Sequence, residues 1–383
     1  MSDEYVKALL NNVRLLREKA GVSAAELEEK MILGPGWVTR IEQGLTVPSV
    51  DMLVAIVRAL NFNLSDLLAD LPQAPEDLEV ERQIYAEQNG NDLDIHFRYA
   101  NHDAVYTLAG ASEEEFDEII RTLRDGLARL NSSARDLGEA IKTDSVATSF
   151  LKAVSVWPSA NPSDLWWFVV YRAYCDPFNH PSTYARLDFT QSWKRTGGWA
   201  LEEVLVKHYS HFLSENGVRL FIPSGAESTV IVNSIDVGDR IEADKIDIAL
   251  AHASQDLANG FFGVVHVKAS FAERRTDDVP MSTALSRAGY TSPLWTMDCK
   301  STPADRPVNK GELGLSGRGR VSAKRRDIED EGYFTGCFSY NSNTVPSNND
   351  LPSERRIHTC NFNDPDDTFA AFILERARTS QMT

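Results

Sequence analysis

The fold of this chain is decided at residues 264–278, which read Val-Val-His-Val-Lys-Ala-Ser-Phe-Ala-Glu-Arg-Arg-Thr-Asp-Asp. The three valines predict a buried strand, because β-branched side chains pack well on a pleated surface. Lys268 stands where that strand ends, and a dense cluster of acids and arginines follows it at once. A buried strand that delivers one lysine beside carboxylates suits chemistry at a metal-bound phosphate. The alternative interpretation is a core strand that runs into a solvated charged turn.

Length and composition limit the class of protein. The chain has 383 residues, enough for two or three domains, and its 42% apolar and 25% charged content is ordinary for a globular protein. No apolar run reaches the length of a membrane span, and the acidic start does not resemble a signal peptide. Four widely separated cysteines predict reduced thiols, so we expect a cytoplasmic protein that contacts no membrane. The net charge of −17 argues against a nonspecific nucleic-acid coat but not against a local basic cleft.

Residues 5–70 have the pattern of a run of short helices. Ser23 followed by Glu26 is a capping-box signature, which predicts the start of a second helix. The sequence Gly-Pro-Gly at residues 34–36 leads into a third helix, and Gly44 closes it. The pattern therefore predicts a small all-α domain.

This domain resembles the Xre/Cro-type helix-turn-helix of phage repressors, chiefly at residues 16–23 and 38–44. Such a domain reads bases with polar side chains near the amino end of its recognition helix. Thr39 and Arg40 are the candidates here, because the residues before them offer almost no side-chain hydrogen bonds. Residues 1–75 hold seven basic and ten acidic residues, a net charge of −3. The domain is therefore expected to bind DNA weakly or to act in dimerisation or docking.

The middle of the chain predicts a linker and a small ββα unit. Residues 71–77 are acidic and contain prolines, which is typical of a linker. Residues 93–108 alternate in hydrophobicity around a turn, which predicts a β-hairpin, and Ser112 opens an amphipathic helix. We assign no chemistry to this unit.

From about residue 185 the pattern changes to a helix followed by strands. Residues 197–205 predict a helix with a glycine start that carries Glu202. Residues 218–222 and 230–235 each predict a strand, and Asp247 leads directly into another. A turn at residues 259–260 would make the strands of Asp247 and Lys268, 21 residues apart, neighbours in a hairpin. We therefore expect these two side chains close together, with Glu202 on a helix that covers the same sheet edge.

The end of the chain carries a basic run and a polar stretch. Arg318, Arg320 and residues 324–326 form a glycine-containing basic cluster, interpreted as a phosphate-contacting arm or, almost equally well, as a solvated loop. Residues 336–350 are rich in Ser and Asn and look loop-like, and a helix is expected from about residue 367 to 377.

The order of a helix with Glu, a strand with Asp and a strand ending in Lys resembles the PD-(D/E)xK nuclease fold. His266 stands two residues before Lys268, where that family usually carries an acid, and a neutral imidazole is a poor ligand for Mg²⁺. Type II restriction endonucleases that cut sites containing CCGG also lack this acid and recruit one from further along. Their signature of Lys-x-Ser and then an acid-Arg pair is matched by residues 268–270 and 273–274. Over about residues 185–300 the chain is similar to this subgroup, and closest to its BsaWI-like members.

This resemblance implies a set of catalytic residues. Asp247 and Asp278, with the Val267 carbonyl, would hold Mg²⁺, for which Mn²⁺ could substitute. Lys268 would orient the attacking water and offset the charge of the transition state. Glu202 would act as a further acid in the second shell or at a second metal. Two alternatives stay open, namely Asp277 in place of Asp278 and Glu203 in place of Glu202.

The same resemblance implies contacts to bases. Glu273 would accept hydrogen bonds from cytosine amino groups, and Arg274 would bind guanine O6 and N7 in the major groove. Arg275 belongs to the same DNA-binding group of residues. Cleavage of both strands of a palindrome needs two such sites, so double-stranded DNA and a homodimer or a dimer of dimers are the expected partners.

The sequence therefore predicts a multidomain protein in which an all-α helix-turn-helix domain at residues 1–71 precedes a linker and ββα unit at 72–140. Residues 141–383 would form an α/β PD-(D/E)xK nuclease domain with a central mixed β-sheet flanked by helices. The predicted function is Mg²⁺-dependent, site-specific double-strand DNA cleavage. The alternative is an Xre-family transcriptional regulator with a non-enzymatic sensor or oligomerisation domain. His266 at the usual acid position suggests a third reading, an inactive nuclease-like scaffold.

Overall fold

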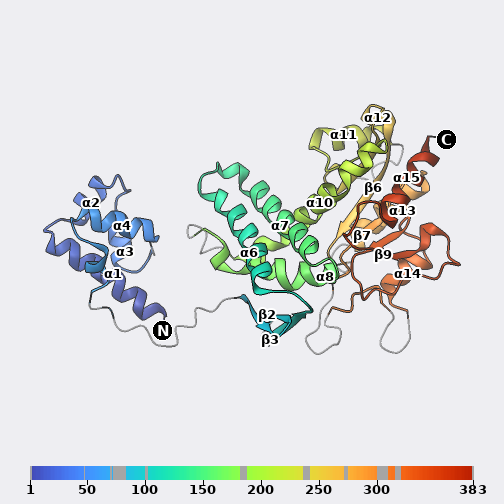
Figure 1. The fold of residues 1–383 in the computed structure, drawn as a ribbon. Coiled ribbons are helices and arrows are strands. Elements are labelled where there is room, and N and C mark those ends of the chain that lie inside the picture. The colour runs from blue at the N-terminus through green and yellow to red at the C-terminus, as the bar shows by residue number, and fades with distance from the viewer. Residues whose placement is uncertain are drawn as a thin grey trace. The chain divides into compact units, whose positions relative to one another are not determined.

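The computed structural model describes residues 2–46, 48–69, 71, 83–99, 102–181, 188–235, 242–270, 275–299, 309–314 and 321–381. The side chains of residues 2–5, 135, 244 and 275–277 lie outside this description. The chain forms two compact units, Met1–Arg82 and Gln83–Thr383, each with a hydrophobic core of its own (Figure 1). In the part of the chain described, no helix is long and apolar enough to cross a membrane.

The first unit is all-α, as predicted. Its helices are α1 (Ser2–Lys19), α2 (Ala24–Lys30), α3 (Trp37–Glu42), α4 (Val50–Ala59) and α5 (Leu64–Leu67). The predicted capping box is present at the start of α2, where the Ser23 hydroxyl accepts a bond from the Glu26 N–H at 3.2 Å. The Glu26 carboxylate in turn accepts from the Ser23 N–H at 2.7 Å. Each helix buries one apolar stripe, so that Val13, Leu27 and Ile41 are fully enclosed in a common core.

The second unit begins with a three-stranded antiparallel sheet and two helices. These elements are β1 (Ile84–Asn89), β2 (Asp92–Tyr99), β3 (His102–Leu108), α6 (Glu113–Ala128) and α7 (Gly138–Val156). The predicted hairpin is formed by β2 and β3, and β1 adds a strand on the other side of β2. Leu93 of β2 and Ile119 of α6 share one continuous core with residues of the central sheet. The expected division at residue 140 falls inside α7, in the middle of this compact unit.

A six-stranded mixed sheet forms the centre of the second unit. Its order is β4-β5-β6-β7-β8-β9, antiparallel from β4 to β6 and parallel from β6 to β9. The strands are β4 (Val218–Phe221), β5 (Ile248–His252), β6 (Phe261–Lys268), β7 (Leu294–Thr296), β8 (Cys337–Ser339) and β9 (Ile357–Thr359). Gly263 of β6 lets the backbone before β7 approach closely, because a Cβ at Gly263 would lie 2.2 Å from the Thr291 carbonyl oxygen. The expected central mixed sheet is therefore present.

Helices cover both faces of this sheet, because alternate residues of each strand point to opposite sides. Val265 of β6 and Trp295 of β7 face a core shared with α10 and α15, whereas Val264 packs on the opposite face with residues of α11 and α13. Helix α14 covers the far end of that second face. The helices in this part are α8 (Pro162–Asp164), α9 (Tyr171–Cys175), α10 (Phe189–Glu215), α11 (Gly225–Ser234), α12 (Leu257–Gly260), α13 (Arg275–Arg287), α14 (Ala323–Glu329) and α15 (Thr368–Ser380).

Three local predictions were wrong. Residues 230–235 were expected to be a strand but lie in or directly after α11, because Ser224 and Glu227 form a capping box that starts a helix. The helix with the expected glycine start is the middle of α10, where Gly197 leaves room for the Trp193 ring, 2.8 Å from where its Cβ would stand. The loop expected at 336–350 contains β8, which is only three residues long.

Candidate active site

Asp247 and Lys268 meet at one edge of the central sheet. Asp247 directly precedes β5, and Lys268 is the last residue of β6. Because these strands are antiparallel neighbours, with Ile248 opposite Val265, the start of β5 lies beside the end of β6. The Lys268 Nζ atom is 2.6 Å from Asp247 Oδ2, and each side chain is 12% exposed. The predicted juxtaposition is therefore present in the structure.

Asp278 reaches the same point from helix α13. Its Oδ2 atom lies 3.5 Å from Lys268 Nζ, and its side chain is also 12% exposed. One ligand atom from each of Asp247, His266 and Asp278 lies within 4.8 Å of the others. Asp278 is thus the acid that the structure brings to Asp247, and the side chain of the alternative, Asp277, lies outside the described residues.

The main chain of Val267 contributes to the same cluster. Its N–H donates to Asp247 Oδ2 at 3.0 Å. In an antiparallel pair the N–H and C=O of one residue point towards the same neighbouring strand, so the Val267 carbonyl faces the Asp247 side of β6. Two carboxylates and one carbonyl oxygen are hard ligands of the kind that Mg²⁺ prefers, and the donor set therefore fits such an ion.

His266 lies inside the sheet, immediately before this cluster. Its side chain is fully buried, and its Nε2 atom is 2.9 Å from Ser292 Oγ. Burial lowers the pKa of His266 to about 4, against a smaller opposite effect from the nearby charge of Asp247, so the ring is neutral at pH 7. The Nδ1 atom has no hydrogen-bond partner among the described residues and lies 3.9 Å from Asp278 Oδ1.

A cavity of about 750 Å³ opens onto Asp247 and Lys268. Glu202 of α10, which the sequence predicts as a further acid, lines this cavity. Its neighbour Glu203 instead lies 3.4 Å from Lys207 Nζ, one turn along the same helix. The structure therefore separates the two candidates, since Glu202 shares the cavity with the cluster and Glu203 pairs with a lysine.

Sequence reasoning missed Glu312, which also lines this cavity. Its carboxylate lies 2.5 Å from Lys324 Nζ and accepts a bond from the Ser270 hydroxyl at 3.1 Å. The backbone N–H of Glu312 donates to Asp298 at 2.6 Å, which fixes its loop. No local pattern could have revealed it, because it belongs to a loop 44 residues beyond Lys268. Also missed were four aromatic side chains that line the same cavity, Trp167, Tyr171, Trp193 and Trp199.

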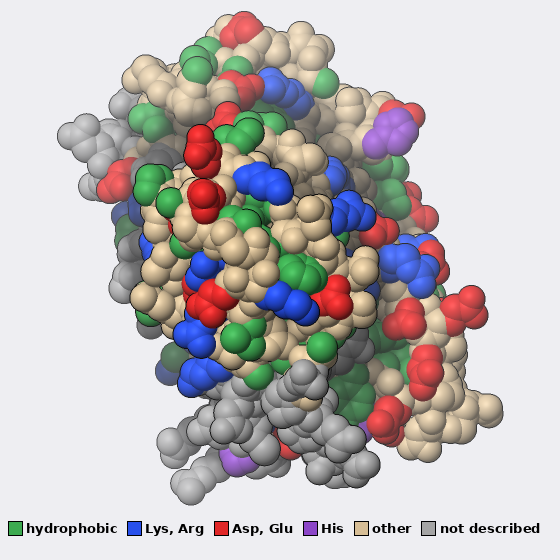
Figure 2. Space-filling model, turned by 90° about the vertical axis from the view of Figure 1, so that its left-hand side faces the viewer, with side chains coloured by type: hydrophobic (Ala, Val, Ile, Leu, Met, Phe, Trp, Pro, Cys, Tyr) green, Lys and Arg blue, Asp and Glu red, His purple; other side chains and the backbone are tan. Residues whose placement is uncertain are grey.

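The structure describes only some of the side chains that were predicted to contact DNA. Glu273 and Arg274 lie outside the described residues, and Arg275 begins α13 with a side chain that is likewise not described. Thr39 and Arg40 are exposed on α3 of the first unit. Lys and Arg side chains are interspersed with Asp and Glu on the face seen in Figure 2.

Two charged side chains are buried and form hydrogen bonds with backbone groups inside the protein. Glu28 of α2 is buried, and it accepts bonds from the N–H groups of Gly36 and Val38 at 3.0 and 2.9 Å. It therefore caps α3, whose own N-cap residue has no side chain to do so. Arg325 of the basic run is buried and donates to the Leu313 and Val345 carbonyls, so as a phosphate-contacting residue it was wrongly predicted.

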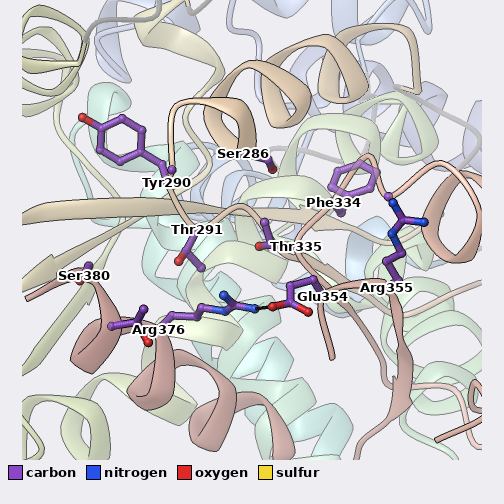
Figure 3. Close-up of a pocket in the computed structure, with 12 residues that line it drawn as sticks. Ser286, Tyr290, Thr291, Phe334, Thr335, Glu354, Arg355, Arg376 and Ser380 are labelled. Carbon is purple, nitrogen blue, oxygen red and sulfur yellow. Dashed lines mark ion pairs between the residues drawn. The ribbon is translucent and has the colours of Figure 1, made fainter. Parts of the chain in front are cut away.

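A second cavity of about 360 Å³ lies between the end of α13 and α15 (Figure 3). Arg376 and Glu354 meet in it as an ion pair 2.5 Å long. Tyr290, Thr291 and Thr335 complete much of its wall. Asp247 and Lys268 do not line it, and two of the charged residues that do, Arg376 and Glu354, are paired with each other, so we assign it no part in the chemistry.

Comparison with known proteins identifies both units. A family model described as a helix-turn-helix domain matches residues 9–71. Over 239 residues the chain is 38% identical to the type II restriction enzyme AgeI of Thalassovita gelatinovora. The alignment covers 60% of this chain and 83% of AgeI. The chain belongs to the type II restriction enzymes. Members of this family are site-specific deoxyribonucleases, so the non-enzymatic regulator is ruled out as a description of the whole protein.

Solved structures agree with this assignment. The crystal structure of an AgeI–DNA complex aligns with a TM-score of 0.63 and 34% identity, covering 74% of this restriction enzyme and 99% of that chain. The α/β unit therefore has the fold of a known restriction endonuclease. A pre-specific BsaWI–DNA complex aligns with a TM-score of only 0.32 and 17% identity, over 70% of this chain and 94% of that one. The BsaWI alignment is too weak to carry an argument.

Proposed function

We propose that this restriction enzyme hydrolyses both strands of DNA in a Mg²⁺-dependent reaction at a palindromic site that contains CCGG. The observation that carries the proposal is the cluster of Asp247, Asp278 and Lys268, with the ammonium 2.6 and 3.5 Å from the two carboxylates. This is the residue set of a PD-(D/E)xK site whose second acid comes from a helix instead of from the lysine strand. The related enzyme AgeI was crystallised with DNA, which supports double-stranded DNA as the substrate.

Asp247, Asp278 and the Val267 carbonyl would hold Mg²⁺, and Mn²⁺ would substitute for it. When bound, such an ion polarises the scissile phosphate and lowers the pKa of a coordinated water. The carboxylates are already oriented for this role, because Asp247 accepts bonds from both the Val267 N–H and Lys268. Each carboxylate is largely buried, which strengthens its attraction for a cation.

Lys268 has two tasks in this proposal. Before substrate binds, its ammonium holds two acids together that would otherwise repel each other. During the reaction it orients the attacking water and offsets the negative charge that develops on the phosphate. Glu202 lines the same cavity and would act as a further acid, through water or a second ion.

Recognition of CCGG would fall to Glu273 and Arg274, which follow the Lys268-Ala269-Ser270 signature. A carboxylate can accept from cytosine N4, and a guanidinium can bind guanine O6 and N7 together. Two copies of the chain, as a homodimer or a dimer of dimers, would present two sites to the palindrome. The first unit would contact DNA weakly through Thr39 and Arg40 or serve in docking.

The test is digestion of a duplex that carries one central CCGG, beside duplexes in which each of these base pairs is changed in turn. We expect Mg²⁺-dependent cleavage of the CCGG duplex only, with each mismatched pair costing roughly 1–3 kcal/mol of discrimination. Arg274→Ala should reduce this discrimination at guanine, whereas Arg58→Ala, an exposed arginine in the first unit, should leave it unchanged. Equal cleavage of all duplexes would refute the assigned site.

A further inference from the structure

We propose that His266 is a third side-chain ligand of the metal, through Nδ1, and that it makes this site bind Mn²⁺ and other first-row transition ions more tightly than Mg²⁺. The inference rests on the proposed metal site at Asp247 and Asp278. It goes further, because it assigns a ligand role to the residue that stands where an acid is expected. Asp247 and Asp278 can bind a divalent cation without a nitrogen ligand, so the role of His266 is a separate claim.

The first observation is the isolation of Nδ1. The His266 side chain is 0% exposed, and Nδ1 has no hydrogen-bond partner among the described residues. Buried polar atoms without partners are rare in folded proteins, since burial removes their bonds to water and returns none. A cation at the cluster would give this atom its partner.

The second observation is the direction in which the ring points. Nδ1 is 3.9 Å from Asp278 Oδ1, too far for a hydrogen bond, and one donor atom from each of Asp247, His266 and Asp278 falls within 4.8 Å of the others. The bonds that Asp247 accepts from described residues fall on Oδ2, so Oδ1 remains to bind a cation. Three donors of two chemical types therefore surround one small space.

The third observation is that neighbouring side chains fix the orientation of the His266 ring. The opposite nitrogen, Nε2, is 2.9 Å from Ser292 Oγ, and the ring packs edge-on against Phe334 with centroids 5.4 Å apart. When Nε2 donates its proton to Ser292, Nδ1 keeps the lone pair that a metal needs. Histidines that bind metals are commonly oriented in this way, by a hydrogen bond from the other ring nitrogen.

Ligand chemistry then sets the preference among ions. An imidazole nitrogen suits first-row transition ions, whereas Mg²⁺ takes oxygen ligands almost exclusively. Two carboxylates keep the site attractive to any divalent cation. The nitrogen adds affinity only for ions that accept it, so the ratio of Mn²⁺ to Mg²⁺ affinity should depend on His266.

The experiment uses the full-length, tag-free protein with one equivalent of Mn²⁺ and pulsed electron paramagnetic resonance, which detects ¹⁴N nuclei bonded to the ion. We expect a ¹⁴N coupling of imidazole type in the wild type. His266→Gln retains an amide near the Nε2 position to bond Ser292 but has no donor at Nδ1. It should lose the coupling and bind Mn²⁺ about tenfold more weakly, with a much smaller change for Mg²⁺.

His252→Gln is the matched control, because His252 is buried on the neighbouring strand β5 but bonds Ser380 and Gln381, away from the cluster. It should retain the coupling. If His266→Gln does not fold, His266→Asn is the second variant; it offers an amide oxygen near the Nδ1 position and should bind Mn²⁺ without the coupling. Bound Mn²⁺ without ¹⁴N coupling in the wild type, or coupling retained in a His266 variant, would overturn the inference.

The proposed function can fail separately. DNA cleavage with Mg²⁺, together with Mn²⁺ held by oxygen atoms alone, would refute the role of His266 and leave the nuclease proposal standing. Nitrogen coupling together with intact DNA under every ion would support the ligand role and refute the cleavage proposal.

Discussion

Replacement of Lys268 by methionine tests the geometry of the cluster without DNA. Lys268, Asp247 and Asp278 are each only 12% exposed, and the ammonium lies 2.6 and 3.5 Å from the two carboxylates. Removal of the cation leaves two largely buried negative charges side by side. Loss of one partner from a buried ion pair costs roughly 3–5 kcal/mol, and some residual exposure favours the lower end, about 3 kcal/mol.

The assay is urea unfolding followed by tryptophan fluorescence, in EDTA and in saturating Mg²⁺. Six of the seven tryptophans belong to residues 83–383, so the signal reports mainly on the second unit. In EDTA, Lys268→Met should lower the free energy of unfolding by about 3 kcal/mol. Mg²⁺ should restore much of this loss, since it replaces the missing positive charge and stabilises the state that binds it.

Lys207→Met is the matched control. Lys207 also joins two carboxylates, at 3.0 Å from Asp144 and 3.4 Å from Glu203, but its side chain is 34% exposed. Exposed pairs contribute about 1 kcal/mol or less, and Mg²⁺ should not compensate for this change. Equal stability of Lys268→Met and wild type in EDTA would refute the reasoning, because the ammonium would then not be holding the two acids.

Three further predictions follow from single contacts. Glu202→Gln should lower the cleavage rate about tenfold or more, whereas Glu203→Gln should cleave at nearly the wild-type rate, because only Glu202 lines the cavity; equal rates in a gel assay would contradict this. Burial lowers the pKa of His180 to about 4, so the folded state stays neutral while the unfolded state takes up a proton below pH 6.5. The free energy of unfolding of the wild type should therefore fall as the pH is lowered from 6.5 to 4. In His180→Gln this fall should be smaller by about 3 kcal/mol, and parallel pH profiles of the two proteins would contradict the prediction. Gly263→Ala should cost about 3 kcal/mol in urea unfolding, since its Cβ would stand 2.2 Å from the Thr291 carbonyl oxygen; an unchanged unfolding midpoint would contradict the close approach of β6 to the backbone before β7.

The sequence predicted what depends on local pattern. The valine run of β6 and the charged residues after it placed Lys268 at a strand end. Asp247 was placed beside it because a turn was expected at residues 259–260, where the structure has the end of the short helix α12. The capping box at Ser23 and Glu26 defined α2 in the same way. In each case the signal lies within a few residues, where hydrogen bonds and side-chain spacing act directly.

Long-range pairing set the limit of prediction. Strands β7, β8 and β9 are three residues long and pair in parallel across distant segments, so no local alternation reveals them. In α11 the β-branched residues favoured a strand, but the Ser224 capping box outweighed them. Glu312 reaches the site only through tertiary bonds to Lys324 and Ser270. That His266 Nδ1 has no hydrogen-bond partner among the described residues is likewise a property of the folded core.

The central claim is that Lys268 and its two acids form a metal-dependent nuclease site. The most direct measurement is incubation of the purified protein with unmethylated phage DNA in Mg²⁺ or in EDTA, beside a Lys268→Ala variant. The account predicts discrete bands in Mg²⁺ alone, absent with Lys268→Ala, and CCGG at the sequenced ends. Intact DNA across several sequences and methylation states, or equal cleavage by the variant, would contradict it.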